Sequence, residues 1–328
     1  MLDSARVLVT GAAGFIGSHL VEALVERGAR VTCMVRYNSA SSLGNLNFLP
    51  PDHLAALTIA AGDITDGDFV HRAMDGHDVV LHLAALIAIP YSYVAPRSYV
   101  RTNVEGTLNV LEAARRLGVR RVVHTSTSEV YGSALYTPID EGHPLQGQSP
   151  YSASKIAADK LAEAYFRSFG VPVVTLRPFN TYGPRQSARA FIPTIISQAL
   201  TQDRITLGAL SPERDMSYVM DTVEGFILAA SVPGIEGETI NLGTGAARAI
   251  GDFARLILGL MGKTMPIVHD PARDRPARSE VMRLVSDNGK AGRLLGWGPR
   301  VPVEDGLRLT IAFVDQNRRA YRPRTYVM

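Results

Sequence analysis

Short apolar runs alternate with longer amphipathic stretches along the first half of the chain. The runs are rich in Val, Ile and Leu and have the length of buried strands, at residues 6–10, 30–35, 57–61, 78–83, 121–126 and 172–176. Between them apolar residues recur every three or four positions, as at 18–27, 104–117 and 152–169, which predicts helices packed on a sheet. This alternation predicts an α/β protein with a Rossmann-type, doubly wound parallel sheet.

The alternation becomes irregular beyond residue 177, where Pro, Gly and Arg interrupt the chain. Residues 1–178 are therefore predicted to form a dinucleotide-binding Rossmann domain, and residues 179–328 mainly a smaller C-terminal substrate-binding lobe. Residues 238–243 have a further strand pattern, so a segment near 216–245 is expected to return to the sheet. The two parts are interleaved in this prediction.

Composition and charge narrow the class of protein. The 328 residues are 46% hydrophobic and 20% charged, as in globular α/β proteins. No apolar run reaches the ~18 residues of a membrane span and no signal-peptide pattern is present, so a cytoplasmic protein without membrane contact is expected. Cys33, the only cysteine, excludes an intrachain disulfide and is expected in the core. The net charge of +3 is spread without a basic block, which argues against a nucleic-acid partner.

A glycine-rich turn follows the first predicted strand and opens the first predicted helix. It reads Gly11-Ala-Ala-Gly14-Phe15-Ile16-Gly17. Glycines let the backbone approach a pyrophosphate, which then lies against the helix N-terminus, where free N–H groups and the helix dipole favour anions. The turn therefore predicts a dinucleotide site.

Tyr151 and Lys155 lie four residues apart on a predicted helix and so share one face. A phenol ionises near pH ~10 in water, and an ammonium beside it favours the phenolate. The pair predicts a proton-transfer site in which Tyr151 is the general base.

These two motifs and their order resemble the extended short-chain dehydrogenase/reductases, the NAD-dependent epimerase/dehydratase family. The same resemblance is carried by Asp63-Ile64, His82 to Ala85, Thr102 to Val104, Thr125 to Gly132, Arg177 to Asn180, Tyr182 to Pro184 and Arg214-Asp215. It implies a tightly bound NAD or NADP that is regenerated in each turnover. The implied cofactor-binding residues are Gly11, Gly14, Phe15, Ile16, Gly17, Arg36, Asp63, Ile64, Leu83, Ala84, Ala85, Tyr151, Lys155 and Pro178.

The choice between NAD and NADP depends on the end of the second strand. An acidic residue there binds the adenosine ribose and selects NAD, but this chain has Arg36, which suits a 2′-phosphate. Most relatives of this branch hold NAD, so both cofactors stay open. Asp63 resembles the adenine-contacting acid, although a turn-forming Asp fits the position nearly as well.

Thr127, Ser128 and Glu129 follow the fifth strand and are the remaining candidate catalytic residues. By resemblance, Thr127 aligns the sugar hydroxyl for Tyr151, and Glu129 removes the C5 proton after oxidation at C4, as in nucleotide-sugar 4,6-dehydratases. The hexose dehydratases carry Asp where Ser128 stands, and a hydroxyl is a far weaker acid. Ser128 therefore either relays a proton or marks a UDP-glucuronate decarboxylase, whose pattern is also Thr-Ser-Glu. A nucleotide-sugar 4-epimerase and a non-catalytic NAD(P)-binding module are further alternatives.

Three longer stretches, at 85–93, 136–146 and 178–188, are similar to bacterial nucleotide-N-acetylglucosamine 4,6-dehydratases of legionaminic acid biosynthesis. This resemblance implies a UDP- or GDP-linked N-acetylglucosamine as substrate, and a homodimer formed through the helices at 104–117 and 152–169. Arginines are suited to the diphosphate. The candidate substrate-binding residues are Tyr91, Asn180, Arg185, Arg214, Arg275 and Arg278. No cluster has metal-ligand spacing, so no metal site is expected, and His82 and His124 are expected in the core.

Overall fold

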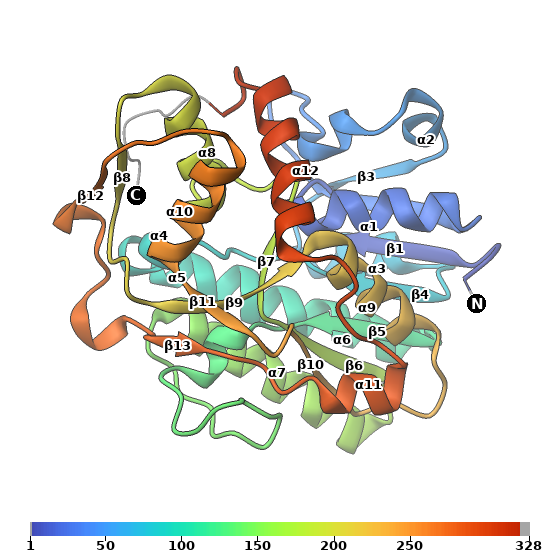
Figure 1. Ribbon diagram of the computed structural model, residues 1–328. Coiled ribbons are helices and arrows are strands. Elements are labelled where there is room, and N and C mark those ends of the chain that lie inside the picture. The colour runs from blue at the N-terminus through green and yellow to red at the C-terminus, as the bar shows by residue number, and fades with distance from the viewer. Residues whose placement is uncertain (1, 322–328) are drawn as a thin grey trace.

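Seven parallel strands form the central sheet in the computed structural model, which describes residues 2–321 (Figure 1). Their order is β3-β2-β1-β4-β5-β6-β10. The predicted doubly wound sheet is thereby confirmed; β1 has the predicted ends, and the ends of the other strands differ from the predicted ones by at most two residues. The strands are β1 (Arg6–Thr10), β2 (Arg30–Arg36), β3 (Thr58–Gly62), β4 (Val79–His82), β5 (Arg121–Thr125), β6 (Val173–Pro178) and β10 (Thr239–Leu242).

Helices cover both faces of this sheet, which explains why β1 is apolar at successive positions. Val7 and Val9 belong to the core that includes Leu20 of α1, whereas Leu8 packs in a separate core with Leu111 of α6. Helix α1 lies beside α9 on one face, and α6 lies beside α3 and α7 on the other. Their bounds are α1 (Phe15–Glu26), α3 (Gly67–Met74), α6 (Gly106–Leu117), α7 (Pro150–Phe169) and α9 (Val219–Ser231).

All three predicted helices begin at other residues than expected, and helix α1 starts at Phe15 and not at residue 18. Helix α7 starts at Pro150, because Ser149 and Ser152 form a reciprocal capping box that fixes its first turn just before Tyr151. Helix α6 starts at Gly106, because the preceding turn η2 (Val100–Glu105) is a π-helix that continues α5 (Pro96–Tyr99). A π-turn leaves no mark in an apolar repeat of 3.6 residues, and such turns are frequent at functional sites.

The second lobe gathers at the upper left of Figure 1, around α8, α10, β8 and β12. A small sheet joins it to the central one, in the order β11-β9-β13 with β7 also paired to β9. Between β9 and β11 the chain returns to the main sheet as α9 and β10, so the two lobes are interleaved. The elements are β7 (Asn180–Tyr182), β8 (Ile205–Leu207), β9 (Glu213–Tyr218), β11 (Ala247–Ala249), β12 (Ile267–His269), β13 (Arg283–Leu284), α8 (Phe191–Thr201), α10 (Ile250–Leu260), α11 (Gly289–Leu295) and α12 (Val303–Gln316).

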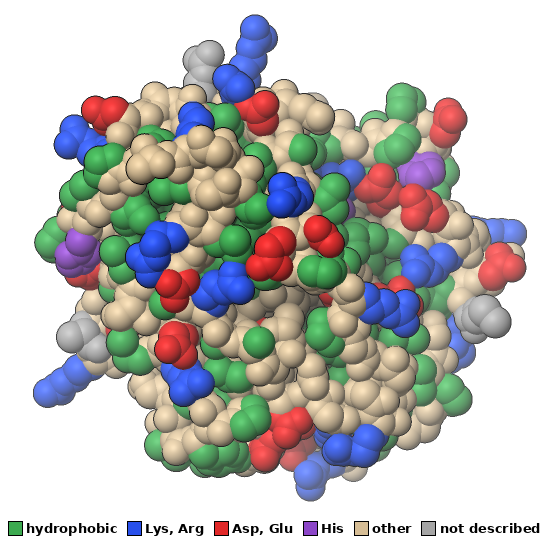
Figure 2. All heavy atoms as spheres, viewed as in Figure 1, with side chains coloured by type: hydrophobic (Ala, Val, Ile, Leu, Met, Phe, Trp, Pro, Cys, Tyr) green, Lys and Arg blue, Asp and Glu red, His purple; other side chains and the backbone are tan. Residues whose placement is uncertain are grey.

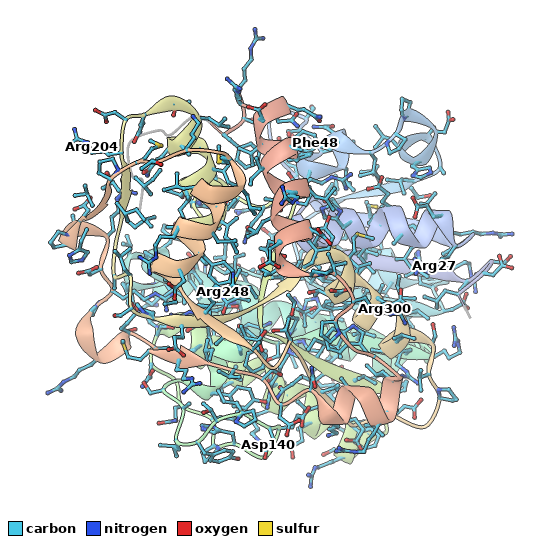
Figure 3. The ribbon with its side chains drawn as sticks, viewed as in Figure 1. Arg27, Phe48, Asp140, Arg204, Arg248 and Arg300 are labelled. Carbon is cyan, nitrogen blue, oxygen red and sulfur yellow. The ribbon has the colours of Figure 1, made fainter. Side chains whose placement is uncertain are left out.

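Helix α12 crosses between the lobes and contacts the first lobe through an aromatic pair. Phe313 of α12 packs edge-on against Phe48, labelled in Figure 3, with ring centroids 5.2 Å apart. The remaining short elements are η1 (Gly44–Phe48), α2 (Pro51–Ala55), α4 (Ile89–Val94), η3 (Ser128–Tyr131), η4 (Pro271–Arg273) and η5 (Ala277–Ser279).

Basic and acidic side chains are interspersed over the face shown in Figure 2. Within residues 2–321 no helix is long and apolar enough to cross a membrane. The predicted core position of Cys33 is confirmed, and burial raises the pKa of its thiol to about 12.

Candidate active site

The glycine-rich turn links β1 to α1 at the carboxyl edge of the sheet. Gly11 has φ +70°, and a Cβ there would lie 2.8 Å from the backbone nitrogen of Ala84; a Cβ on Gly17 would clash with the carbonyl oxygen of Gly11. Helix α1 begins with Gly14 as its N-cap, with neither a side-chain cap nor an acidic residue in its first turn. Its N–H groups are thus left for an anion, so the turn fits a dinucleotide's pyrophosphate.

The neighbouring strand ends are tied to this turn by Thr10. Its Oγ1 accepts hydrogen bonds from the backbone N–H groups of Leu83 and Ala84, both at 3.1 Å. The loop after β4 is therefore fixed against the glycine turn, as a shared cofactor site requires.

Arg36 and Asp63 lie at the ends of adjacent strands. Arg36 is exposed at the end of β2. Asp63 Oδ1 accepts hydrogen bonds from both the backbone N–H and the hydroxyl of Thr65, each at 2.9 Å, and the backbone bond lowers the pKa of Asp63. These contacts match the turn-forming interpretation of Asp63.

Tyr151 and Lys155 are both buried on α7. Lys155 Nζ donates a hydrogen bond to the carbonyl oxygen of Thr125 at 2.5 Å, and the Tyr151 ring lies edge-on to Tyr99 at 6.2 Å. Burial lowers the pKa of Lys155 to about 8, and Asp159 opposes this shift.

In the free protein burial, and not the Lys155 ammonium, dominates the pKa of Tyr151. Burial raises the pKa of Tyr151, because desolvation disfavours the phenolate, and the charge of Glu129 raises it further. A hydrogen bond with the Thr127 hydroxyl works in the opposite direction.

Thr127 and Glu129 follow β5, and both lie near the Tyr151 hydroxyl. Thr127 Oγ1 accepts a hydrogen bond from the Glu129 backbone N–H at 3.2 Å, which begins the short helix η3. The Glu129 side chain is 12% exposed and its Oε1 lies 3.5 Å from Nη1 of Arg275; Ser128 is buried. The structure thus brings a hydroxyl, a phenol, an ammonium and a carboxylate together at the carboxyl edge of the sheet.

Two arginines of the second lobe face this carboxylate. Arg214 of β9 is 4% exposed, and its Nη2 donates to Glu280 Oε1 at 3.0 Å; Arg275 Nη1 lies 3.9 Å from the same oxygen. We call Glu129, Arg214, Arg275 and Glu280 the four-charge cluster. Arg275 Nη1 is also buried without a hydrogen-bond partner, as is Oδ1 of Asn180, so both atoms are available to a polar ligand.

The other substrate candidates are placed differently. Tyr91 is 39% exposed and its ring contacts that of Tyr99, and Arg278 is exposed. Arg185 is buried, with Nη2 2.7 Å from Glu22 Oε2 of α1, and its carbonyl accepts a hydrogen bond from Asn45. Glu22 pairs with Nη2 alone, and Nε and Nη1 of Arg185 are buried without a hydrogen-bond partner, so Arg185 stays a candidate diphosphate donor.

A buried network beneath Lys155 was not predicted. Asp159, one turn further along α7, accepts hydrogen bonds from Ser126 Oγ at 2.8 Å and Arg177 Nη2 at 3.0 Å, and lies 3.1 Å from Nε2 of His124. Asp159 lies four residues after Lys155, and this spacing on a helix could have predicted that the two side chains are neighbours. His124 and His82 are buried and hydrogen-bonded, as expected of core histidines.

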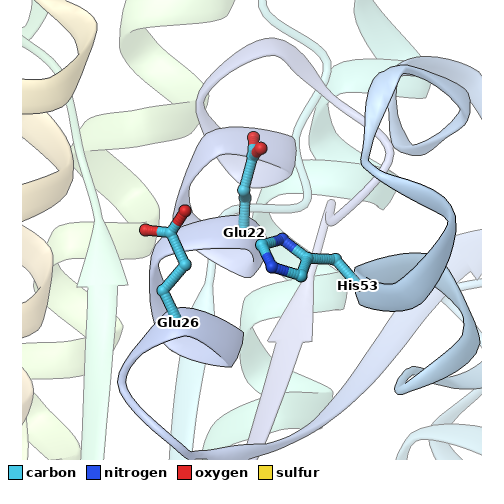
Figure 4. Close-up of side chains that lie close together, drawn as sticks. All are labelled: Glu22, Glu26 and His53. Carbon is cyan, nitrogen blue, oxygen red and sulfur yellow. The ribbon is translucent and has the colours of Figure 1, made fainter.

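One possible metal-binding trio lies outside this site, within the part of the chain that the structure describes. Glu22 and Glu26 of α1 and His53 of α2 place ligand atoms within 4.8 Å of one another (Figure 4). Glu22 is also the partner of Arg185, whose positive charge disfavours a cation beside it.

The fold and the site together define a dinucleotide-binding enzyme of the short-chain dehydrogenase/reductase type. The model of the GDP-mannose 4,6 dehydratase family matches residues 8–310. The chain belongs to this family, within the NAD-dependent epimerase/dehydratases, as the motifs predicted.

Relatives of known activity include both dehydratases and epimerases. A dTDP-glucose 4,6-dehydratase of Streptomyces antibioticus is 37% identical over 326 residues, which cover 97% of this chain and 95% of that protein. A dTDP-glucose 4,6-dehydratase of Streptomyces venezuelae, a double mutant solved with NAD and DAU bound, has a TM-score of 0.87 at 33% identity and covers 97% and 99% of the two chains. An epimerase of Methanothermobacter thermautotrophicus has a TM-score of 0.89 at 30% identity, with 98% and 95% covered.

Proposed function

We propose that the protein is a nucleotide-sugar 4,6-dehydratase that converts a UDP- or GDP-linked N-acetylglucosamine to the 4-keto-6-deoxy sugar. The observation that carries the proposal is the meeting of Thr127, Glu129, Tyr151 and Lys155 at the sheet edge, with Arg214 and Arg275 opposite. The first four residues suit oxidation at C4 and proton removal at C5, and the arginines suit a diphosphate.

Each residue has a separate task in this proposal. Thr127 orients the C4 hydroxyl, and Tyr151 takes its proton. Burial favours the neutral phenol, so the Thr127 hydrogen bond and the Lys155 ammonium one turn away are needed to favour the phenolate. A bound nicotinamide would supply the oxidising power by accepting the C4 hydride and returning it to C6.

Glu129 is the base of the elimination in this proposal. Once C4 is a ketone the C5 proton is acidic, and Glu129 removes it. Glu129 then passes this proton to the C6 hydroxyl, which leaves as water, and C5 later takes a proton from solvent. Ser128 stands where the hexose dehydratases carry an acid, so we assign it to the relay of that proton and not to its supply. The decarboxylase remains the second candidate, because its reaction needs no leaving-group acid.

The nucleotide cofactor is proposed to be NAD or NADP, held by the glycine turn; if it is NADP, Arg36, exposed at the end of β2, would meet the 2′-phosphate. NAD is bound in the Streptomyces venezuelae dehydratase structure. A homodimer through α6 and α7 stays part of the proposal.

The proposal is tested by product analysis in deuterated water. We expect the purified protein, without added cofactor, to convert UDP- or GDP-N-acetylglucosamine to a product that has lost water and carries one deuterium at C5. dTDP-glucose and UDP-glucuronate are incubated in parallel. Conversion of dTDP-glucose alone would refute the acetamido substrate, loss of carbon dioxide from UDP-glucuronate would make the protein a decarboxylase, and no product from any sugar would favour a binding module.

The pH dependence of turnover should report Lys155. Because kcat/KM follows ionisations of the free enzyme and the pKa of Lys155 is about 8, kcat/KM should fall as pH rises through that value and Lys155 loses its charge. Initial rates at low substrate concentration, measured from neutral to alkaline pH, test this. A flat alkaline limb would show that the ammonium is not required.

A further inference from the structure

Glu280 is paired with Arg214, the arginine that we expect to bind the diphosphate. Its Oε1 accepts the 3.0 Å hydrogen bond from Arg214 Nη2, lies 3.9 Å from Arg275 Nη1, and accepts a third contact from the Val281 backbone N–H at 3.1 Å. Arg214 is 4% exposed and Glu280 15% exposed, so solvent screens the pair only weakly. A carboxylate oxygen between two guanidinium groups makes the contacts that a phosphate oxygen would make.

The four-charge cluster is neutral before any ligand arrives, with two arginines and two glutamates. A diphosphate brings further negative charge toward Arg214 and Arg275, where both carboxylates already lie. Since like charges in a partly buried site repel, the diphosphate can bind only if one of the two carboxylates moves away from the arginines. Glu129 has a chemical task in the proposed reaction, whereas Glu280 has none.

We infer that Glu280 is an internal substitute for the substrate diphosphate: it neutralises Arg214 and Arg275 in the free enzyme and yields them when the diphosphate binds. This inference rests on the proposed function. Glu280 is thus a positioning residue that acts through the arginines, and it sets the affinity for the nucleotide without touching the reacting atoms.

The backbone around Glu280 is anchored, so the exchange needs only its side chain to move. Ser279 Oγ donates to the carbonyl oxygen of Gln148 at 2.7 Å and also contacts Tyr93 Oη at 2.5 Å. On the other side, the Glu213 backbone N–H donates to the Met282 carbonyl at 2.8 Å. Glu280 lies between these two attachments, and its carboxylate contacts Arg214, Arg275 and the Val281 backbone N–H, contacts that a rotation of the side chain would release.

The test compares the binding of UDP, GDP and dTDP to the wild type and to Glu280→Gln by calorimetry. Loss of the competing charge should tighten binding of the preferred nucleoside diphosphate about tenfold, the scale of one charged hydrogen bond. In turnover assays KM should fall by a similar factor while kcat changes little. Glu280→Asp, which keeps the charge, should return the affinity toward the wild type.

Glu213→Gln is the matched control, because Glu213 is the neighbour of Arg214 on β9 but its carboxylate pairs with Arg283, 3.0 Å away. It should bind as the wild type does. Unchanged or weaker binding by Glu280→Gln, with an intact fold by circular dichroism, would overturn the inference and leave Glu280 as a support of Arg214. If no nucleoside diphosphate bound even to the wild type, the proposed function itself would fail.

Discussion

Tyr151→Phe should lower turnover by roughly 10²- to 10⁴-fold while leaving the fold intact. General acid–base groups contribute roughly 10²- to 10⁴-fold to a rate, and the variant removes only the hydroxyl that takes the C4 proton. The ring keeps its edge-on contact with Tyr99, and only the hydrogen bond with Thr127 is lost. Steady-state turnover of the accepted sugar nucleotide measures the loss, and thermal unfolding verifies the fold.

Tyr165→Phe is the control for this substitution. Tyr165 lies on the same helix and donates its hydroxyl proton to Glu112, outside the site, so its loss should leave turnover near the wild-type value. Tyr151→Phe with more than a tenth of wild-type activity would remove Tyr151 from the proposed mechanism.

The strands of the sheet were predictable because local apolar patterns mark their positions along the chain. β1, β4 and β5 are mostly apolar runs, since helices cover both sides of them, and β1 is followed by Gly11 and β5 by Ser126, at the edge where the ligand is expected. Thr127, Glu129, Tyr151 and Lys155 could therefore be assigned to one edge from their positions after strands and on a helix. Their contacts with one another depend on the fold and were only implied.

The Tyr151 pKa and the role of Glu280 were beyond the sequence for a physical reason. Motif spacing shows that an ammonium is near a phenol, but not how deeply both are buried, and here desolvation outweighs the charge. Glu280 follows an arginine-rich loop, and from the sequence alone a carboxylate in such a loop is expected to be exposed to solvent. Its pairing with Arg214 of β9 spans 66 residues and exists only because β13 lies next to β9. The ion pair of Arg185 with Glu22 was equally hidden, because Glu22 is distant in sequence.

Glu129→Gln should separate the two halves of the proposed reaction. Oxidation at C4 relies on Thr127, Tyr151 and Lys155, so the reduced nicotinamide should still form, visible by its near-ultraviolet absorbance. Elimination should slow by roughly 10²- to 10⁴-fold, because an amide cannot take the C5 proton. Rapid mixing with substrate followed by mass analysis of the product measures both steps.

Glutamine keeps the size of the side chain, so loss of elimination reports the missing base and not a cavity. Glu163→Gln on the exposed side of α7 removes a carboxylate that pairs only with Lys160 and Arg167, and should leave both steps unchanged. Glu129→Gln also distinguishes a dehydratase from a decarboxylase. A decarboxylase needs no C5 base, because its C4 ketone suffices to release carbon dioxide. Full product formation by Glu129→Gln on the N-acetylglucosamine nucleotide would refute Glu129 as the base, whereas continued loss of carbon dioxide from UDP-glucuronate would identify a decarboxylase in which Glu129 only positions the substrate.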